Sequence, residues 1–357
     1  MTATSLDKVA ALRKRDPGGM LGALRALPDQ CREAWTKASG LKLPVAYQNI
    51  DRIVVLGMGG SAIAGDLWRA LLQRESAVPV FNVRQYDLPP FVDKQTLVIA
   101  SSFSGETEEV LSAFGQALAT PAHRIAITTG GQLLTTARAN GVPAFSFTYN
   151  QEPRAAIGWG LMPLLAIGEA LGLMQDVGRD VDAAIQALSE VVAESEEDVP
   201  EAKNGAKQLA RQLHEKLPVI YGAGPLLEVA HRWKTQLNES AKTWACYEEL
   251  PELHHNSIVG YGLPQATAKE TAVVFLESNA LVHQRVRLRY EFTKELLRKA
   301  GVSVLSAEAG DGCALAQMLS LVLLGDYVST YLAFLYGVDP TPTKVIDELK
   351  AWLREQK

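Results

Sequence analysis

Short, continuous apolar runs alternate with helical patterns along most of this 357-residue chain. Continuous runs, unlike alternating ones, are typical of strands that are buried on both faces of a parallel sheet. Because stretches with helical spacing separate the runs, the pattern predicts βαβ units and an α/β fold of parallel sheets flanked by helices. The predicted strands are 52–56, 95–100, 124–128, 144–147, 217–221, 271–277 and 302–306. One predicted helix begins near Ala62, and the others span 108–119, 133–140, 226–242 and 283–300.

The same pattern occurs twice in the chain. IVVLGMGGSAIAGDLWRALL and PVIYGAGPLLEVAHRWKTQL each predict a strand, a glycine turn and a helix, with Gly57 and Gly222 in register, which indicates two similar halves. Residues 154–178 are apolar nearly all round and predict a buried helix, and two amphipathic helices follow, split by the acidic stretch 194–200. We therefore expect a helical arm at 1–45, a first domain at 46–178, a helical linker at 179–215 and a second domain at 216–357.

Composition and charge narrow the class of protein. Apolar residues make up 47% of the chain and charged residues 21%, which excludes a disordered or collagen-like chain. The net charge of −5 argues against a nucleic-acid partner. We expect no signal peptide, and we expect the apolar stretch 314–338 to be a buried helix, because Gln317, Ser320 and Asp326 interrupt it. The three cysteines, Cys31, Cys246 and Cys313, are scattered and show neither CxxC nor zinc spacing. We therefore expect a reduced, cytoplasmic protein without a membrane partner.

The glycine turn GMGGSAIAGD (57–66) lies between a predicted strand and a predicted helix. Glycine lets a ligand approach the backbone, and the N-terminus of the next helix offers free N–H groups, so the turn predicts an anion site. The glycines do not fit the GxGxxG pattern of a dinucleotide-binding fold. An ordinary strand–helix turn that holds no ligand is the alternative.

The serine loop SSFSGET (101–107) follows the next strand. Its hydroxyls, on Ser102, Ser104 and Thr107, suit a phosphate monoester, whose oxygens accept many hydrogen bonds. Simple N-capping of the following helix is the alternative. Adjacent parallel strands would bring this loop and the glycine turn to one sheet edge, where open α/β sheets bind ligands.

Together, the two loops in a duplicated α/β chain resemble the sugar isomerase (SIS) domain. The segments EELPELHHNSIVGY and PTPTKVIDELK resemble one branch of that superfamily, the bifunctional phosphoglucose/phosphomannose isomerases, over about 51–350. The resemblance implies two SIS-type subdomains, each with a parallel sheet flanked by helices. Glu106 stands where asparagine is common in this branch, and SGET also occurs in aminosugar-phosphate isomerases. The resemblance implies that the substrate phosphate is bound by Gly59, Gly60, Ser61, Ser102, Ser104 and Thr107.

Four further residues take catalytic roles through the resemblance. Helical spacing alone places Glu239 with Arg232 and Thr235 on the side of helix 226–242 that faces away from its apolar stripe, as a solvated carboxylate. The resemblance instead makes Glu239 the catalytic base in a cleft between the halves. It assigns ring opening to His255 and Lys350 and a place near the reacting carbons to Arg154. His254 receives no chemical role. Thr343 corresponds to the threonine that admits both C2 epimers, with Thr341 as its rival.

The resulting functional hypothesis is an aldose–ketose isomerase. It would interconvert glucose 6-phosphate and mannose 6-phosphate with fructose 6-phosphate through a cis-enediolate, with no metal and no cofactor. The family forms dimers, which implies a homodimer whose active site lies at the subunit boundary and takes His255 from the neighbouring chain. The alternatives are a non-catalytic sugar-phosphate sensor and an aminosugar-phosphate isomerase.

Overall fold

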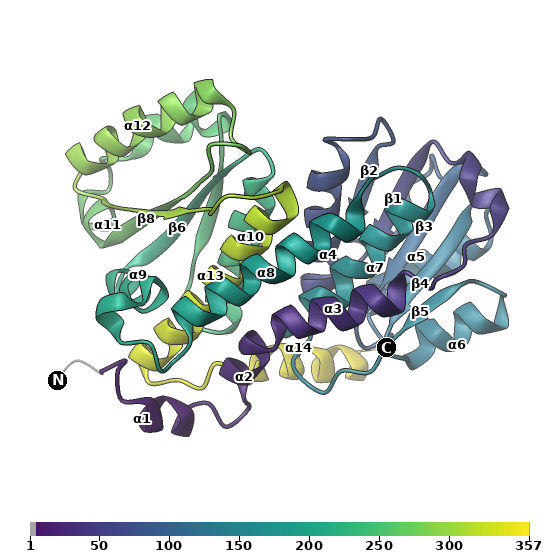
Figure 1. The fold of residues 1–357 in the computed structure, drawn as a ribbon, viewed down its shortest axis with the longest axis horizontal. Helices are drawn as coiled ribbons and strands as arrows, with labels where there is room; N and C mark the ends of the chain where they lie inside the picture. Colours follow the sequence, from purple (N-terminus) through teal and green to yellow (C-terminus); the bar gives the residue numbers. More distant parts are fainter. Residues whose placement is uncertain (1–4, 357) are drawn as a thin grey trace.

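Two parallel sheets form the framework of the fold, and helices flank both of them (Figure 1). The structure is a computed structural model, and it describes residues 5–356. The first sheet has the strand order β2-β1-β3-β4-β5, and the second has the order β7-β6-β8-β9. Every strand pair is parallel, which confirms the predicted α/β class. The strands are β1 (Arg52–Leu56), β2 (Val80–Val83), β3 (Thr96–Ser101), β4 (His123–Thr128), β5 (Ala144–Ser146), β6 (Leu217–Ala223), β7 (Cys246–Leu250), β8 (Thr271–Glu277) and β9 (Ser303–Glu308).

The helices fall into three groups. Those before the first sheet are α1 (Val9–Lys14), α2 (Met20–Arg25), α3 (Leu27–Ala38) and the 3-10 turn η1 (Val45–Asn49). Those that connect strands are α4 (Gly59–Leu72), α5 (Glu108–Leu118), α6 (Gly131–Ala139), α10 (Leu226–Glu239), η4 (Glu252–His255), η5 (Ser257–Gly260), α11 (Gln265–Glu270) and α12 (Gln284–Lys299). Those that join the halves or end the chain are η2 (Pro153–Ala155), α7 (Ile157–Ala170), α8 (Val177–Ser195), η3 (Glu201–Lys203), α9 (Gly205–Leu213), α13 (Ala314–Tyr336) and α14 (Lys344–Glu355).

The two halves repeat one topology. In each sheet the first strand, β1 or β6, lies between the second and the third strands of its half. In each half a helix, α4 or α10, follows the first strand directly after a glycine turn. The duplication that the register of Gly57 and Gly222 indicated in the sequence therefore has a counterpart in the strand order.

Two edge strands were not predicted from the sequence. β2 and β7 each lie at the end of a sheet, and each exposes part of one face. The sequence of β7, CYEEL, contains two glutamates and no continuous apolar run. An edge strand can lack a continuous apolar run, because part of its surface faces solvent. Polar side chains on an edge strand also discourage pairing with the sheet of another chain.

Helix α13 is the central buried helix. Among the residues that the structure describes, it is the helix long and apolar enough to cross a membrane, but 89% of its most apolar window is buried inside the protein. It packs on α8, α9 and α10. The sequence-based prediction of a buried helix at 314–338 is therefore confirmed.

The acidic stretch 194–200 anchors the helices before the first sheet. Glu197 is only 2% exposed, and its carboxylate accepts hydrogen bonds from Arg13 (2.9 Å) and Arg25 (2.6 Å). These two arginines lower the pKa of Glu197, although burial, the largest single influence, raises it. The helices at the start of the chain are thus tied to the segment between α8 and α9.

Candidate active site

The carboxyl ends of β1 and β3 lie side by side, because these strands pair with each other. The strand order reverses at this point of the sheet, which is where open α/β sheets bind ligands. A small pocket there is lined by Gly60 and Ser61 from the glycine turn and by Ser101 and Phe103 from the start of the serine loop. The two loops therefore meet at one edge, as predicted.

The glycine turn forms the start of helix α4. The helix begins at Gly59, three residues earlier than predicted, and Gly59 has a φ of +50°, which favours glycine. No side chain caps this helix, and its first turn contains no acidic residue. The first turn of α5, in contrast, contains Glu108 and Glu109, whose charges repel an anion. Of these two helix N-termini, the one at Gly59 is the better suited to a phosphate.

The serine loop is held in shape by its own hydroxyls. Ser102 Oγ lies 2.8 Å from Thr107 Oγ1 and accepts a hydrogen bond from the Gly105 N–H at 3.1 Å. Gly105 has a φ of +72°, and a Cβ at this position would lie 2.0 Å from the carbonyl oxygen of Gly130. Ser104 is exposed and accepts only a local bond from the Glu106 N–H. Ser102 and Thr107 thus shape the loop, and Ser104 faces outward.

Glu106 points to the neighbouring helix α6. Its Oε1 atom accepts a hydrogen bond of 2.7 Å from the backbone N–H of Gln132, in the first turn of that helix. A carboxylate is favourable at a helix N-terminus, and an asparagine oxygen could accept the same kind of bond. The departure from the family's asparagine therefore preserves an acceptor for α6.

Arg154 lies directly behind the glycine turn. A Cβ on Gly60 would approach the Pro153 carbonyl oxygen to 3.3 Å and Arg154 Cα to 3.6 Å. The Arg154 side chain is buried, and its Nη2 donates to the carbonyl oxygens of Pro340 (2.8 Å) and Thr341 (2.5 Å). Arg154 Nη1 donates to Glu152 Oε2 at 3.1 Å, and one Nη1 hydrogen has no partner among residues 5–356.

Glu239 is half-buried at the end of α10, directly before Ser240. Arg154 Nε donates to Ser240 Oγ at 3.3 Å, so the end of α10 lies against the Arg154 turn. The face of α10 that carries Glu239 is not the solvated surface that helical spacing predicted. Arg232, on that same face, is 1% exposed, because the first half of the chain and α13 cover it.

Lys242 is a cation at this site that the sequence did not single out. Its Nζ donates to the carbonyl oxygens of Glu239 (2.5 Å) and Pro340 (3.1 Å). Burial and the neighbouring charge of Arg154 lower the pKa of Lys242. Its backbone has a φ of +56°, an uncommon conformation for lysine. The turn after α10 thus places a second positive charge beside Arg154.

The two rival threonines lie on the segment that Arg154 holds. Thr341 gives its carbonyl oxygen to Arg154, and its side chain packs so closely on Gly18 that a Cβ there would lie 2.4 Å away. Thr343 is half-buried at the start of α14 and has no side-chain capping bond. The side chain of Thr341 therefore packs against the turn between α1 and α2.

His255 and Lys350 are exposed, unlike the buried Arg154 and the half-buried Glu239. His255 is exposed at the end of η4, and Lys350 is exposed on α14, a helix without a buried residue. His254 has a packing role, since its Nε2 lies 2.7 Å from Thr293 Oγ1 on α12. Burial and the charge of Arg289 lower the pKa of His254.

The matching edge of the second sheet is closed. Ser278 follows β8 as Ser102 follows β3, and both serines are buried, at 3% and 2% exposed. Its hydroxyl donates to Gln317 Oε1 at 2.6 Å and accepts from the N–H groups of Ala280 (3.2 Å) and Leu281 (2.9 Å). This serine has no bond to spare for a ligand, so the first sheet carries the phosphate-type edge.

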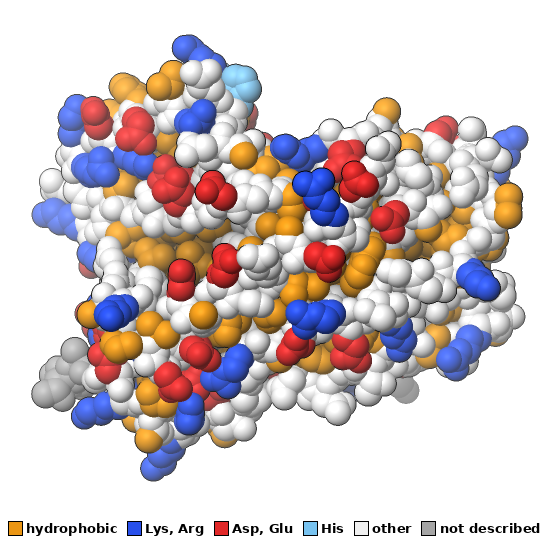
Figure 2. Space-filling view, in the orientation of Figure 1, with side chains coloured by type: hydrophobic (Ala, Val, Ile, Leu, Met, Phe, Trp, Pro, Cys, Tyr) orange, Lys and Arg blue, Asp and Glu red, His pale blue; other side chains and the backbone are white. Residues whose placement is uncertain are grey.

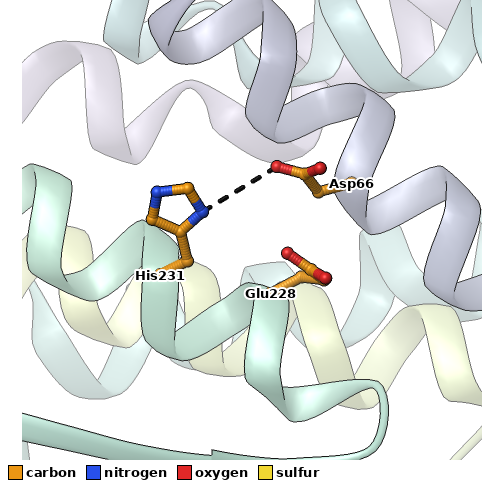
Figure 3. A group of neighbouring side chains, drawn as sticks. All are labelled: Asp66, Glu228 and His231. Carbon is orange, nitrogen blue, oxygen red and sulfur yellow. Dashed lines mark ion pairs between the residues drawn. The ribbon is translucent and has the colours of Figure 1, made fainter. Parts of the chain in front are cut away.

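A cluster of potential metal ligands lies between the halves (Figure 3). Asp66 on α4 faces Glu228 and His231 on α10, with all ligand atoms within 4.8 Å of one another. Each carboxylate already has an arginine partner, since Arg84 pairs with Asp66 and Arg69 pairs with Glu228. These four charged groups balance, which favours an ion-pair network that holds α4 against α10 over a cation site.

A groove of about 470 Å³ lies elsewhere, between α9, β9 and α13. Figure 2 shows a hollow with apolar side chains on this face, below the lobe that carries α12. The charged residue in its lining is Glu308. Without a cation, this groove lacks the chemistry that a phosphate requires.

The glycine turn and the serine loop at one sheet edge of a duplicated α/β fold place this protein in the SIS class. Residues 46–144 match the SIS domain, and residues 202–353 match the bacterial phospho-glucose isomerase C-terminal SIS domain. A hypothetical protein of Thermus thermophilus has a similar fold, with a TM-score of 0.77 and 18% identity over 98% of this chain and 94% of that chain.

Curated relatives define the family more narrowly. The bifunctional phosphoglucose/phosphomannose isomerase of Caldicellulosiruptor bescii is 41% identical over 339 residues, which cover 95% of this chain and 100% of the relative. The enzyme of the same description from Aquifex aeolicus is 34% identical over 85% of this chain and 90% of the relative. The chain belongs to the bifunctional phosphoglucose/phosphomannose isomerase family, and it is an isomerase.

Proposed function

We propose that this protein interconverts glucose 6-phosphate and mannose 6-phosphate with fructose 6-phosphate. The observation that carries the proposal is the meeting of two kinds of group at one place. The open N-terminus of α4 and the serine loop suit a phosphate. The Arg154 turn packs on that helix and also contacts the end of α10, which carries Glu239.

The phosphate would be bound by the glycine turn (Gly59, Gly60 and Ser61) and by the serine loop (Ser102, Ser104 and Thr107). This contact holds the far end of the substrate, and its binding energy then orients the reactive carbons. His255 and Lys350 would help to open the sugar ring by moving the proton of the anomeric hydroxyl to the ring oxygen, O5, as the bond between O5 and the anomeric carbon breaks. Thr343 would leave room for both C2 epimers.

Isomerisation itself requires one base and one positive charge. Glu239 removes the proton from C2 of the open-chain aldose, and the electron pair moves into a C1–C2 enediolate. Return of the proton to C1, with transfer of the O2 hydroxyl proton to O1, gives the ketose. The enediolate is planar at C2, so reprotonation from either face yields either epimer. Arg154, with one N–H left unpaired among the described residues, would stabilise the negative charge on oxygen.

We also propose that the active enzyme is a cytoplasmic homodimer. The exposed apolar face of α14 supports a second copy of the chain as its cover, because Val345 and Leu349 are 77% and 54% exposed. The exposed position of His255 supports the same idea, since a partner's His255 could complete the site. The free cysteines are consistent with a reducing compartment.

A coupled assay of the wild-type protein with glucose, mannose and glucosamine 6-phosphates tests this function. Turnover of the glucose and mannose substrates is the expected result. Glu239→Gln should lower kcat by about 10² to 10⁴ and leave the affinity for inorganic phosphate within about twofold. Glu270→Gln, an exposed carboxylate on α11, is the matched control. Turnover of glucosamine 6-phosphate alone would point to an aminosugar-phosphate isomerase, and binding without any turnover would point to a sensor.

A further inference from the structure

A buried ion pair lies directly behind the Arg154 turn. Arg232 on α10 and Asp326 in the middle of α13 are 1% and 2% exposed. Arg232 Nη2 donates to Asp326 Oδ2 at 2.7 Å. The proposed mechanism uses neither residue. Both are charged, although α13 is buried nearly all round.

The same guanidinium group also binds the Arg154 backbone. Arg232 Nη2 donates to the carbonyl oxygen of Arg154 at 2.8 Å. One side chain therefore joins three elements: α10, α13 and the η2 turn. On its other side, the Arg154 guanidinium is held by Ser240 and by the carbonyl oxygens of Pro340 and Thr341. Arg232 thus holds the backbone of Arg154, and Ser240 and the 340–341 segment hold its side chain.

Stability alone does not account for this pair. Removing two charges from water is expensive, and well-packed apolar residues of similar volume are often at least as stabilising. The pair is also incompletely satisfied, because Arg232 Nε and Asp326 Oδ1 are buried without a hydrogen-bond partner among the residues described. What the pair provides, and an apolar pair could not, is a directed hydrogen bond to the carbonyl oxygen of Arg154.

We propose that Asp326 and Arg232 are positioning residues for the isomerase reaction, in which Asp326 orients Arg232 so that Arg232 fixes the turn carrying Arg154. The inference rests on the proposed function for its catalytic consequence. An error of about 1 Å in the place of a stabilising charge can cost about 100-fold in rate. Binding of the phosphate by the glycine turn and the serine loop should change little, because the hydrogen bonds and the ion pair of Arg232 and Asp326 go to each other and to Arg154, not to those residues.

The test uses the double substitution Arg232→Met and Asp326→Leu in the full-length protein. Two apolar side chains of similar volume remove both charges together, which avoids leaving one buried charge unpaired. Arg232→Lys is the second variant, because it keeps the charge but loses the forked geometry. Lys294→Met is the control, since the buried Lys294 on α12 forms an ion pair of 2.9 Å with the partly exposed Glu277 on β8 and has no hydrogen bond or ion pair with Arg154 among the residues described. Thermal unfolding establishes that each variant is folded.

Two readouts then decide the proposal. Hydrogen exchange of the peptides covering 152–158 and 338–343 should become at least about tenfold faster in the double variant and in Arg232→Lys, but not in the control. In the same variants kcat should fall by about 10- to 100-fold, with KM and the affinity for inorganic phosphate changed by less than about threefold. Unchanged exchange or unchanged kcat in a folded double variant overturns the proposal. An inactive wild type would instead overturn the proposed function, and the exchange measurement would still decide whether the pair fixes the turn.

Discussion

Replacing Glu228 with glutamine is expected to change how the stability of the protein depends on pH. Glu228 lies on α10, faces Asp66 across the contact between α4 and α10, and is 7% exposed. Burial, and then the negative charge of Asp66, raise the pKa of Glu228 from 4.5 to about 7, although Arg69 and Arg84 oppose this change. In the unfolded chain the carboxyl has its ordinary pKa, so the folded protein binds this proton more tightly.

The sign and size of the effect follow from proton linkage. Between pH 4.5 and about 7 the folded state holds more protons at Glu228 than the unfolded state, so the free energy of unfolding falls as the pH rises. The difference between the two pKa values corresponds to about 3 kcal/mol, because one pKa unit is about 1.4 kcal/mol. The stabilising effect is complete below pH 4.5 and is lost above about pH 7. Glutamine does not titrate and lacks this contribution at every pH.

Urea unfolding at pH 5, 6, 7 and 8, followed by the fluorescence of the six tryptophans, measures the effect. The unfolding free energy of the wild type minus that of Glu228→Gln should decrease by about 2.5 kcal/mol from pH 5 to pH 8, because part of the full effect is already lost at pH 5. The comparison is between the pH dependences of the unfolding free energy, because loss of the contact with Arg69 also shifts its absolute value. Glu190→Gln, an exposed carboxylate on α8, should give a constant difference. A constant difference for Glu228→Gln as well would refute the reasoning, since it would mean that Arg69 keeps the carboxylate ionised throughout.

Three further substitutions test the loops, the second cation and the proposed dimer. Gly105→Ala places a Cβ 2.0 Å from a carbonyl oxygen at a φ of +72°. Calorimetry should therefore show that inorganic phosphate binds at least about tenfold more weakly. Gly115→Ala is the control, because its Cβ would meet open space and the change should be neutral or stabilising. Lys242→Asn keeps a residue that tolerates a positive φ but removes the Nζ, so kcat should fall at least about tenfold; wild-type kcat would exclude a role for this cation. Leu349→Glu puts a charge on the exposed face of α14 and should give monomers by light scattering together with low activity; an active monomer would show that one chain completes the site.

The arrangement of the sheets could be predicted because buried parallel strands leave a simple signal. Their apolar runs are continuous, and the glycine turn and serine loop follow two such runs directly. Adjacency of β1 and β3 then brings both loops to one edge. The two missed strands, β2 and β7, are edge strands whose residues are largely half-exposed or exposed, and neither contains a continuous apolar run, unlike the edge strands β5 and β9 that were predicted.

The surroundings of α10 could not be predicted in this way. Helical spacing identifies the apolar stripe that packs on the helix's own sheet, and it assigns every polar residue on the opposite face to solvent. Arg232 lies on that opposite face and is nevertheless buried, because α13 and the Arg154 turn cover it. Burial between two halves of a chain depends on contacts that are distant in sequence, and one helix cannot report them. The position of Lys242 depends similarly on an unusual backbone turn.

The two halves share a topology but differ at the ligand-binding edges of their sheets. In both sheets the first strand lies between the second and the third strands of its half and is followed by a glycine turn, so each half has the geometry of a ligand-binding edge. In the second half, the Ser278 hydroxyl donates a hydrogen bond to Gln317 on α13. It also accepts hydrogen bonds from the backbone N–H groups of Ala280 and Leu281. The second edge is thereby closed, and α10 is instead directed toward the first half, where its end meets the Arg154 turn. A phosphate-type edge on one half and a carboxylate from the other can act together only if α4 and α10 stay in register. Asp66 and Glu228 lie in that contact with their arginine partners, which is why the protonation of Glu228 is expected to change the free energy of unfolding of the whole molecule.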